Sequence, residues 1–189
     1  MSLLIKQSKN FLSPEQKKII TQVIEKSELP FYMGPAFHSL KYPYLSHVLV
    51  KRPEDRRGDP GKRNVDDITY PSKYTATNQF NSIHADTFLE FLFAFCDKYK
   101  IKVNRVFRAA INLSFNIGLK KCPSHVDHEF DHKQLIIYLN DCDKDAKTIL
   151  LKKGDQISEI ITPEKYKGVL FKKCKHYLVY PKKGCRIIA

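Results

Sequence analysis

Apolar residues recur with the period of a helix in two segments of the N-terminal half. In the first segment they share one helical face: Ile19, Ile20, Val23 and Ile24. Just upstream, Ser13 supplies an N-cap, Pro14 the first helical position and Gln16 the reciprocal partner of a capping box. The pattern therefore predicts a helix that begins at Pro14 and ends before Pro30.

The second helical segment runs from about His84 to Lys100. Its apolar stripe is mostly aromatic and contains Phe88, Phe91, Leu92, Phe95 and Tyr99. Phenylalanines at this spacing are more often core than binding residues, so we expect the stripe to be buried. Upstream, Tyr44–Val50 predicts a strand. Between the strand and the helix, Lys51–Ser82 is rich in Pro and Gly, and it predicts a long loop of the kind that is usually functional or disordered.

Downstream of Val103 the pattern changes to short apolar runs. The runs are Val106–Phe115, Leu135–Leu139, Thr148–Leu151, Ile157–Ile161, Val169–Phe171, Tyr177–Tyr180 and Arg186–Ile188. Turn residues such as Asn140-Asp141 and Gly154-Asp155 separate them. Many short strands at such intervals are typical of a β-sandwich or β-barrel. The sequence therefore predicts helices first, which support an antiparallel double sheet in the C-terminal half.

Composition fits one folded domain. The 189 residues are 42% hydrophobic and 12% aromatic, enough for a core, and we expect a single domain over 1–189. No apolar run reaches the roughly 18 residues of a membrane span, and residues 1–10 lack the features of a signal peptide. The five cysteines are scattered without a CxxC pair, which argues against a disulfide framework or a thiolate zinc site. We therefore expect a cytoplasmic protein with no membrane partner.

The net charge of +13 is concentrated near the C-terminus, where Lys165–Ala189 contains eight Lys and Arg residues and no Asp or Glu. A positive field of this kind attracts nucleic acids and other anionic partners. A lysine-rich solvated surface is the simpler interpretation. The charge therefore makes nucleic acid a possible partner without assigning it.

The candidate chemistry lies in the segment Ser124–His132, which contains three histidines and three carboxylates. In one interpretation, His128, Glu129 and His132 form an HExxH motif of a zinc metalloprotease, in which two histidines on one helical face bind zinc and the glutamate is the base. Pro123 upstream and the β-branched run downstream disfavour the helix that this motif requires.

The second interpretation places the start of a strand at the same cluster. Alternation along a strand then directs His125 and Asp127 to one face. His176, in a later strand-like run, would complete a facial triad of two histidines and one carboxylate, the ligand set of non-haem Fe(II). Arg186 follows in another short strand, and its guanidinium is suited to hold a carboxylate through two parallel hydrogen bonds.

These residues, in this order, resemble a known family. The motifs are His125-Val126-Asp127, Ile137-Tyr138-Leu139-Asn140, Ile161-Thr162-Pro163, Gly168-Val169-Leu170-Phe171, His176, Pro181 and Arg186. Together they resemble the Fe(II)- and 2-oxoglutarate-dependent dioxygenases, in particular the prolyl 4-hydroxylase-like branch. The tyrosine common upstream of the H-x-D motif in this branch is Phe115 here.

The resemblance implies a fold that is α+β and mainly β, with a double-stranded β-helix (jelly-roll) core over 104–189. Residues 1–103 would supply the supporting N-terminal helices and the long substrate loop, a possible lid. It implies His125, Asp127 and His176 as the iron ligands. By the same resemblance, Arg186 binds the distal carboxylate of 2-oxoglutarate and the Tyr138 hydroxyl donates to it.

The activity that the resemblance implies is hydroxylation of a peptide or protein, at prolyl residues, with release of succinate and CO₂. The cofactors are Fe(II) and 2-oxoglutarate, and the family allows ascorbate as well. Three alternatives stay open from the sequence: an oxidative nucleic-acid demethylase on the same barrel, the HExxH metalloprotease, and a non-catalytic binding module that uses the basic face.

Overall fold

The computed structural model describes residues 2–26, 29–35, 39–51 and 81–189. The chain divides into two compact units, one formed by Met1–Ser46 with Asn112–Ala189 and the other by His47–Ile111. A single domain over 1–189, with its β core beginning at residue 104, stays a prediction. The predicted loop Lys51–Ser82 falls almost entirely in 52–80, so the lid expectation lies outside the described residues.

Both predicted helices are present. Helix α1 (Pro14–Glu25) begins with the predicted capping box, in which the Gln16 backbone N–H donates to Ser13 Oγ (3.1 Å) and the Ser13 N–H to Gln16 Oε1 (2.9 Å). Helix α2 (Ala85–Lys98), in the second unit, buries its aromatic stripe at Phe88, Phe91 and Phe95, as expected of core residues. In the part of the chain that the structure describes, neither helix is long and apolar enough to cross a membrane.

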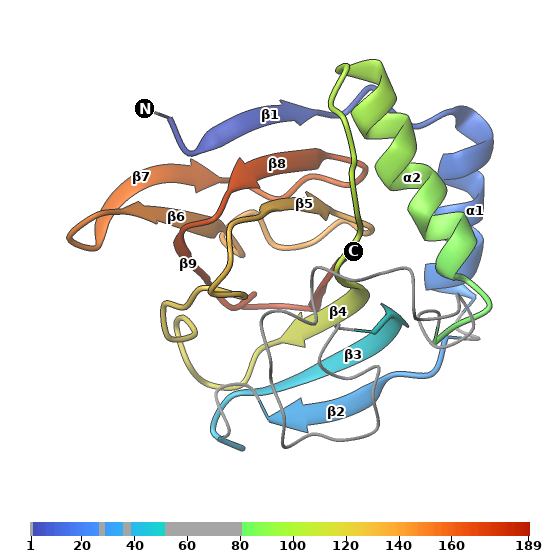
Figure 1. The fold of residues 1–189 in the computed structure, drawn as a ribbon. Coiled ribbons are helices and arrows are strands. Elements are labelled where there is room, and N and C mark those ends of the chain that lie inside the picture. Colours follow the sequence, from blue (N-terminus) through green and yellow to red (C-terminus); the bar gives the residue numbers. More distant parts are fainter. Residues whose placement is uncertain (1, 27–28, 36–38, 52–80) are drawn as a thin grey trace, which may run out of the picture. The chain divides into compact units, whose positions relative to one another are not determined.

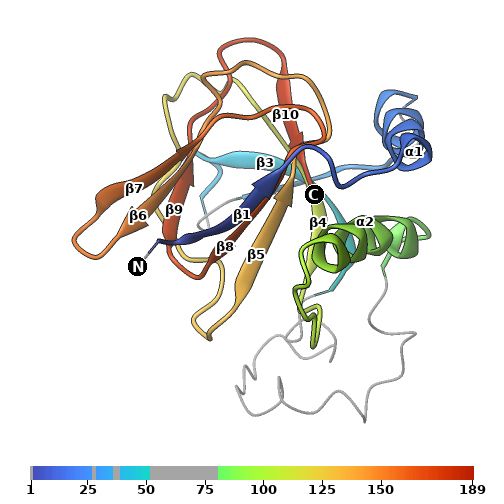
Figure 2. The same ribbon diagram turned by 90° about the horizontal axis from the view of Figure 1, so that it is seen from above.

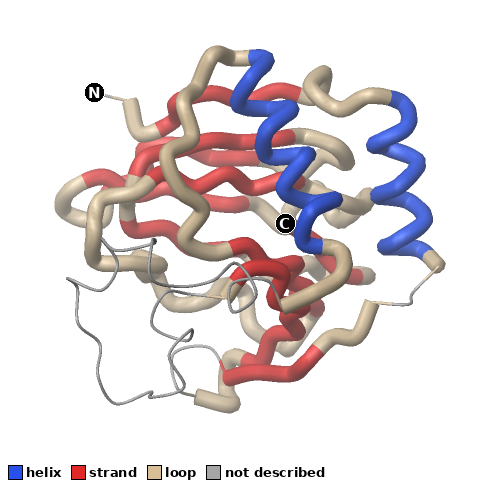
Figure 3. Tube along the Cα trace, turned by 45° about the vertical axis from the view of Figure 1, so that its right-hand side comes forward, coloured by secondary structure: helices blue, strands red, loops and turns tan. Residues whose placement is uncertain are grey.

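Strands make up most of the remaining regular structure (Figure 3). They are β1 (Leu4–Ser8), β2 (Tyr32–Pro35), β3 (Pro43–Val50), β4 (Ala109–Phe115), β5 (Lys133–Ile137), β6 (Thr148–Lys152), β7 (Gln156–Ile161), β8 (Gly168–Lys172), β9 (Lys175–Leu178) and β10 (Cys185–Ile188). They form three sheets, in the orders β1-β8-β5, β10-β4-β3-β2 and β7-β6-β9 (Figures 1 and 2).

Isolated backbone pairs join these sheets into two layers. Tyr138, just after β5, pairs with Ile188 of β10, which connects the first two sheets. His125 pairs with His176 of β9, so the segment before β5 lies along the edge of the third sheet. The result is the predicted double-stranded β-helix, in which β5, β8 and β10 lie in one layer and β6, β7 and β9 in the other.

The core of the first unit lies between these layers. Buried residues from both sheets pack in one cluster: Tyr138, Leu150, Ile161, Val169, Phe171 and Cys174. Burying an aliphatic or aromatic side chain of this size contributes roughly 1.5–3 kcal/mol. The cluster therefore fixes β6 and β8, and with them the strands that carry the polar groups described below.

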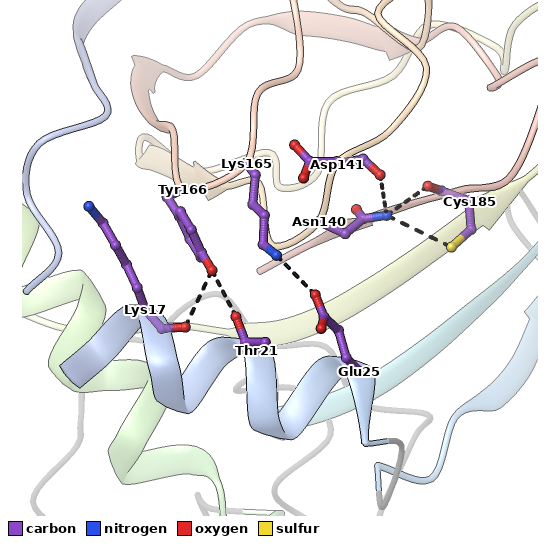
Figure 4. Close-up of polar contacts among 8 residues, drawn as sticks. All are labelled: Lys17, Thr21, Glu25, Asn140, Asp141, Lys165, Tyr166 and Cys185. Carbon is purple, nitrogen blue, oxygen red and sulfur yellow. Dashed lines mark hydrogen bonds and ion pairs between the residues drawn. The ribbon is translucent and has the colours of Figure 1, made fainter. Parts of the chain in front are cut away.

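Helix α1 is tied to the segment between β7 and β8, as Figure 4 shows. The Tyr166 hydroxyl hydrogen-bonds with Thr21 Oγ1 (2.8 Å) and donates to the Lys17 carbonyl (3.4 Å), while Lys165 Nζ is 2.9 Å from Glu25 Oε1. The Tyr166 backbone N–H in turn donates to the Tyr138 carbonyl (2.7 Å). Helix α1 thus supports the backbone of a predicted site residue, which is the supporting role expected of it.

Two details differ from the sequence predictions. Strands β1 and β2 were not predicted; both are short and lie at the edges of their sheets, where no long apolar pattern is required. The prediction that a strand begins at the H-x-D motif (His125-Val126-Asp127) is wrong. In this motif only His125 pairs with a neighbouring strand, and Asp127 lies in a bend. The neighbouring strand β9 is only four residues long, and Pro123 has no N–H to extend the pairing.

Candidate metal centre and anion site

His125, Asp127 and His176 converge in the structure. One donor atom of each lies within 4.8 Å of the others. His125 Nε2 is 3.4 Å from Asp127 Oδ1, and His176 Nε2 is 3.7 Å from Asp127 Oδ2. The two histidines are brought together by their backbone pair, in which each N–H donates to the other's carbonyl (3.0 and 2.9 Å). Two imidazole nitrogens and one carboxylate oxygen on one side of a centre are the donor set that suits Fe(II).

Each of the two imidazoles is held by a carbonyl of its own backbone. His125 Nδ1 lies 3.1 Å from the Pro123 carbonyl, and His176 Nδ1 lies 3.2 Å from the Cys174 carbonyl. A carbonyl only accepts, so in the neutral form of each ring Nδ1 carries the hydrogen and Nε2 has the lone pair. A second hydrogen bond of this kind fixes the tautomer of metal-binding histidines. The arrangement therefore presents both Nε2 atoms as ligands.

Asp127 is oriented by Gln134, a residue of β5 that the sequence analysis did not identify. Gln134 Nε2 donates to Asp127 Oδ2, which leaves Oδ1 as the oxygen facing His125. The sequence does carry a signal for Gln134. It directly precedes the apolar run Leu135–Leu139 at an even spacing from Tyr138, so it shares a strand face with Tyr138.

The charges of the two histidines differ. Burial opposes charge on His125, but its hydrogen bonds to Asp127 and Cys122, the Asp127 charge and the Pro123 carbonyl outweigh burial and raise its pKa to about 10. In His176 burial prevails and lowers the pKa, and the positive charges of His125 and Arg186 act in the same direction. At neutral pH His125 is therefore protonated and His176 neutral, so a divalent cation that binds here displaces one proton.

The second predicted feature, Arg186 with Tyr138, is also assembled. Arg186 is 2% exposed and Tyr138 fully buried, and the guanidinium carbon lies 5.3 Å from the centre of the Tyr138 ring. Arg186 Nη2 donates to Thr148 Oγ1 (2.6 Å), which also hydrogen-bonds with the Tyr138 hydroxyl (3.0 Å). Thr148 was not predicted as a site residue. The feature of the sequence that marks Thr148 is its hydroxyl group, the one polar side chain of the run Thr148–Leu151.

Within the described part of the chain, Arg186 has no anionic partner. Its buried Nε has no hydrogen-bond acceptor, and among the described residues no carboxylate forms an ion pair with it. An uncompensated buried charge is costly, and a carboxylate that accepts two parallel hydrogen bonds is the group that best relieves it. The residues therefore fit the carboxylate of a bound ligand.

The anion site lies close to the metal centre along the sheet. Thr148 is two residues from Leu150 on β6, and Leu150 is the register partner of His176 on β9. Diagonal neighbours of this kind are about 7–8 Å apart. A short dicarboxylate held by Arg186 is therefore within reach of the three candidate ligands.

The HExxH motif does not lie on a helix. Residues 128–132 are irregular rather than helical, so His128 and His132 are not presented side by side on a helical face. The two imidazole rings still meet edge to face (centroids 5.3 Å apart), while His128 also stacks on Phe130 (4.8 Å) and His132 Nδ1 lies 2.8 Å from the Phe130 carbonyl. Glu129 is exposed. The helix that the metalloprotease interpretation requires is therefore absent from this described segment, and the metal-ligand side chains that converge are His125, Asp127 and His176.

No model of a protein family matches the sequence, and no curated protein matches it either. Solved structures do match. A 2OG-Fe(II) oxygenase family oxidoreductase from Burkholderia pseudomallei superposes with a TM-score of 0.62 at 12% identity, over 94% of this chain and 78% of that chain. A prolyl-4-hydroxylase from Pseudomonas putida superposes with a TM-score of 0.56, also at 12% identity, over 97% of this chain and 88% of that chain. The chain therefore has the fold of the 2OG-Fe(II) oxygenases, as its sequence motifs predicted.

Proposed function

We propose that the protein is an Fe(II)- and 2-oxoglutarate-dependent dioxygenase. His125, Asp127 and His176 would hold the iron, and Arg186 with Tyr138 would hold the distal carboxylate of 2-oxoglutarate. The observation that carries the proposal is the buried Arg186 guanidinium, whose Nε has no partner, beside three convergent metal-ligand side chains. An oxygenase fold without the activity would have no need to keep such a charge buried.

When bound together, iron and 2-oxoglutarate supply the oxidising chemistry, in which O₂ is consumed, succinate and CO₂ are released and a substrate C–H bond is hydroxylated. The protein supplies position and charge. The Pro123 and Cys174 carbonyls hold the imidazole nitrogens toward the metal, and Gln134 holds Asp127. Arg186 neutralises the distal carboxylate in a site that burial keeps dry, where a charge-assisted hydrogen bond is strongest.

The substrate that we propose is a prolyl residue in a peptide or protein. One neighbour in fold is a prolyl-4-hydroxylase. The metal centre is more open on the side of His125 and Asp127, whose side chains are 29% and 26% exposed, than at His176, which is 10% exposed. A chain as bulky as a peptide therefore reaches the centre from the His125–Asp127 side.

The test is succinate formation from 2-oxoglutarate by the protein with Fe(II), O₂ and ascorbate. It is run without substrate, with a pool of proline-containing peptides, and with a methylated single-stranded oligonucleotide. We expect slow turnover alone and stimulation by the peptides, with a matching mass gain of one oxygen. Stimulation by the oligonucleotide alone would replace the peptide proposal with a nucleic-acid demethylase. No succinate in any arm, from a protein that is folded and loaded with iron, would refute the enzyme.

A further inference from the structure

The side chain of Asn140 forms a bridge between two strands of the first unit. It lies just after Tyr138-Leu139, where the chain turns away from β10. Its Nδ2 donates to the Cys185 carbonyl (2.9 Å) and to the Asp141 carbonyl (3.1 Å), and its Oδ1 accepts from the Ile187 N–H (2.8 Å). Figure 4 shows the contacts of Nδ2. The amide thus bonds the backbone on both sides of residue 186.

The bridge continues a main-chain pairing that would otherwise stop. Tyr138 pairs with Ile188, and the Leu139 N–H donates to the Ile187 carbonyl (3.0 Å). The backbone of Asn140 does not continue the pairing with β10, because the chain bends at this residue. The primary amide of Asn140 offers the same donor and acceptor as a peptide group, so it takes that place.

Arg186 itself is held on its other side by β4. It is the register partner of Ser114, whose hydroxyl donates to the Arg186 carbonyl (3.5 Å). Among the described residues its guanidinium has one hydrogen-bond acceptor, Thr148. The direction of this long side chain therefore depends mainly on how firmly residues 185–187 are fixed between β4 and Asn140.

We propose that Asn140 is a positioning residue that sets the Arg186 guanidinium for the distal carboxylate of 2-oxoglutarate. The inference rests on the proposed function for its ligand, and on the two contacts that flank Arg186 for its geometry. Without the amide, the Cys185 carbonyl and the Ile187 N–H lose their partners, and the segment that carries Arg186 is free to shift. A displacement of about 1 Å in a positioned group is enough to weaken binding or turnover by on the order of a hundredfold.

The experiment compares Asn140→Ala with Asn116→Ala. Asn116 is a matched control, because it also bridges backbone groups, donating to the Lys182 carbonyl (3.1 Å) and accepting from the Gly118 N–H (2.8 Å), but it does not flank Arg186. Dissociation constants are measured by calorimetry for Mn(II), and then for 2-oxoglutarate in the presence of Mn(II), which does not turn over. Asn140→Ala should bind 2-oxoglutarate at least about tenfold more weakly, the equivalent of one or two lost hydrogen bonds, with Mn(II) binding retained. Asn116→Ala should bind both as the wild type does.

A variant that keeps only the hydrogen-bond acceptor of Asn140 tests whether each of its contacts contributes to 2-oxoglutarate affinity. Asn140→Asp still accepts from the Ile187 N–H but cannot donate to the Cys185 carbonyl, so its loss of affinity should fall between wild type and Asn140→Ala. It also serves for the same measurements if Asn140→Ala does not fold. Unchanged 2-oxoglutarate affinity in Asn140→Ala, or an equal loss in Asn116→Ala, would overturn the positioning role.

A readout without the ligand keeps this role separate from the proposed function. The Arg186 Nε–H signal in a ¹⁵N nuclear magnetic resonance spectrum reports the side chain directly. We expect it to shift and exchange faster with water in Asn140→Ala but not in Asn116→Ala. If the wild type does not bind 2-oxoglutarate while this difference is seen, the proposed function fails and the positioning stands. An Arg186 signal that is the same in all three proteins overturns the positioning whether or not the ligand binds.

Discussion

Replacing Arg186 with lysine keeps the positive charge of the anion site and removes its planar fork. In the structure Nη2 is committed to Thr148 at 2.6 Å, and Nε is left for the ligand. A lysine ammonium is a single point charge at the end of a different stem, so it cannot hold Thr148 and both oxygens of a carboxylate in one fixed geometry. The three metal-ligand side chains are not altered. The loss should therefore fall on binding of 2-oxoglutarate.

The size of the effect follows from the contact that is lost. A hydrogen bond to a charged group contributes about 1.5–3 kcal/mol, which corresponds to about a tenfold to hundredfold rise in KM for 2-oxoglutarate. The maximal rate should change less, because lysine still neutralises the bound carboxylate. Arg186→Met, which removes the charge as well, should lose more affinity. In the absence of 2-oxoglutarate it should unfold at the same temperature or higher, since it removes a buried charge without an anionic partner.

Two assays separate these effects. Initial rates of succinate formation over a range of 2-oxoglutarate concentrations give KM and kcat for wild type and Arg186→Lys. Thermal unfolding with Mn(II) then shows whether 2-oxoglutarate stabilises each protein; at a hundred times the dissociation constant the wild type should gain about 2.7 kcal/mol. The same ligand concentration should give Arg186→Met much less. An unchanged KM in Arg186→Lys would refute the assignment of Arg186 as the carboxylate anchor.

Two further predictions concern the side chains around the metal. Gln134→Leu should weaken Mn(II) binding by about tenfold or more, because Asp127 loses the donor that orients it; equal Mn(II) affinity in Gln134→Leu and the wild type would contradict this role. Glu129→Gln should keep near-normal 2-oxoglutarate turnover, because Glu129 is exposed and outside the metal centre. An inactive Glu129→Gln protein would contradict this and would favour the HExxH interpretation, in which Glu129 is the base.

The sequence was sufficient to predict the residues whose type and spacing together indicate a metal site. Alternation and chain order brought together His125, Asp127 and His176, and the short apolar runs predicted the strands of the core. The strand expected at the H-x-D motif was nevertheless wrong. The two ligands share a direction because His125 pairs with His176 and Asp127 is held by Gln134, not because they lie along a regular strand.

The residues that were missed depend on contacts between strands that are far apart in the sequence. Thr148 on β6 accepts a hydrogen bond from Arg186 on β10, a strand of another sheet, and a single sequence gives the period of a strand but not its partners. Asn140 is similar, since it lay in a predicted turn and its partners on β10 are more than forty residues away. Polar residues at the start of apolar runs, such as Gln134 and Thr148, were the signal available. Their partners could be found only from the fold.

The central claim is that one site holds both a divalent metal and 2-oxoglutarate. Its most direct test is the calorimetric binding of 2-oxoglutarate to the wild type with and without Mn(II), repeated with Asp127→Ala. We predict one equivalent of 2-oxoglutarate bound tightly only when Mn(II) is present, and no metal-dependent binding by Asp127→Ala, whose fold is retained because Asp127 lies in a half-exposed bend outside the core. Binding that is independent of Mn(II), or a folded Asp127→Ala protein that binds both as the wild type does, would contradict the account.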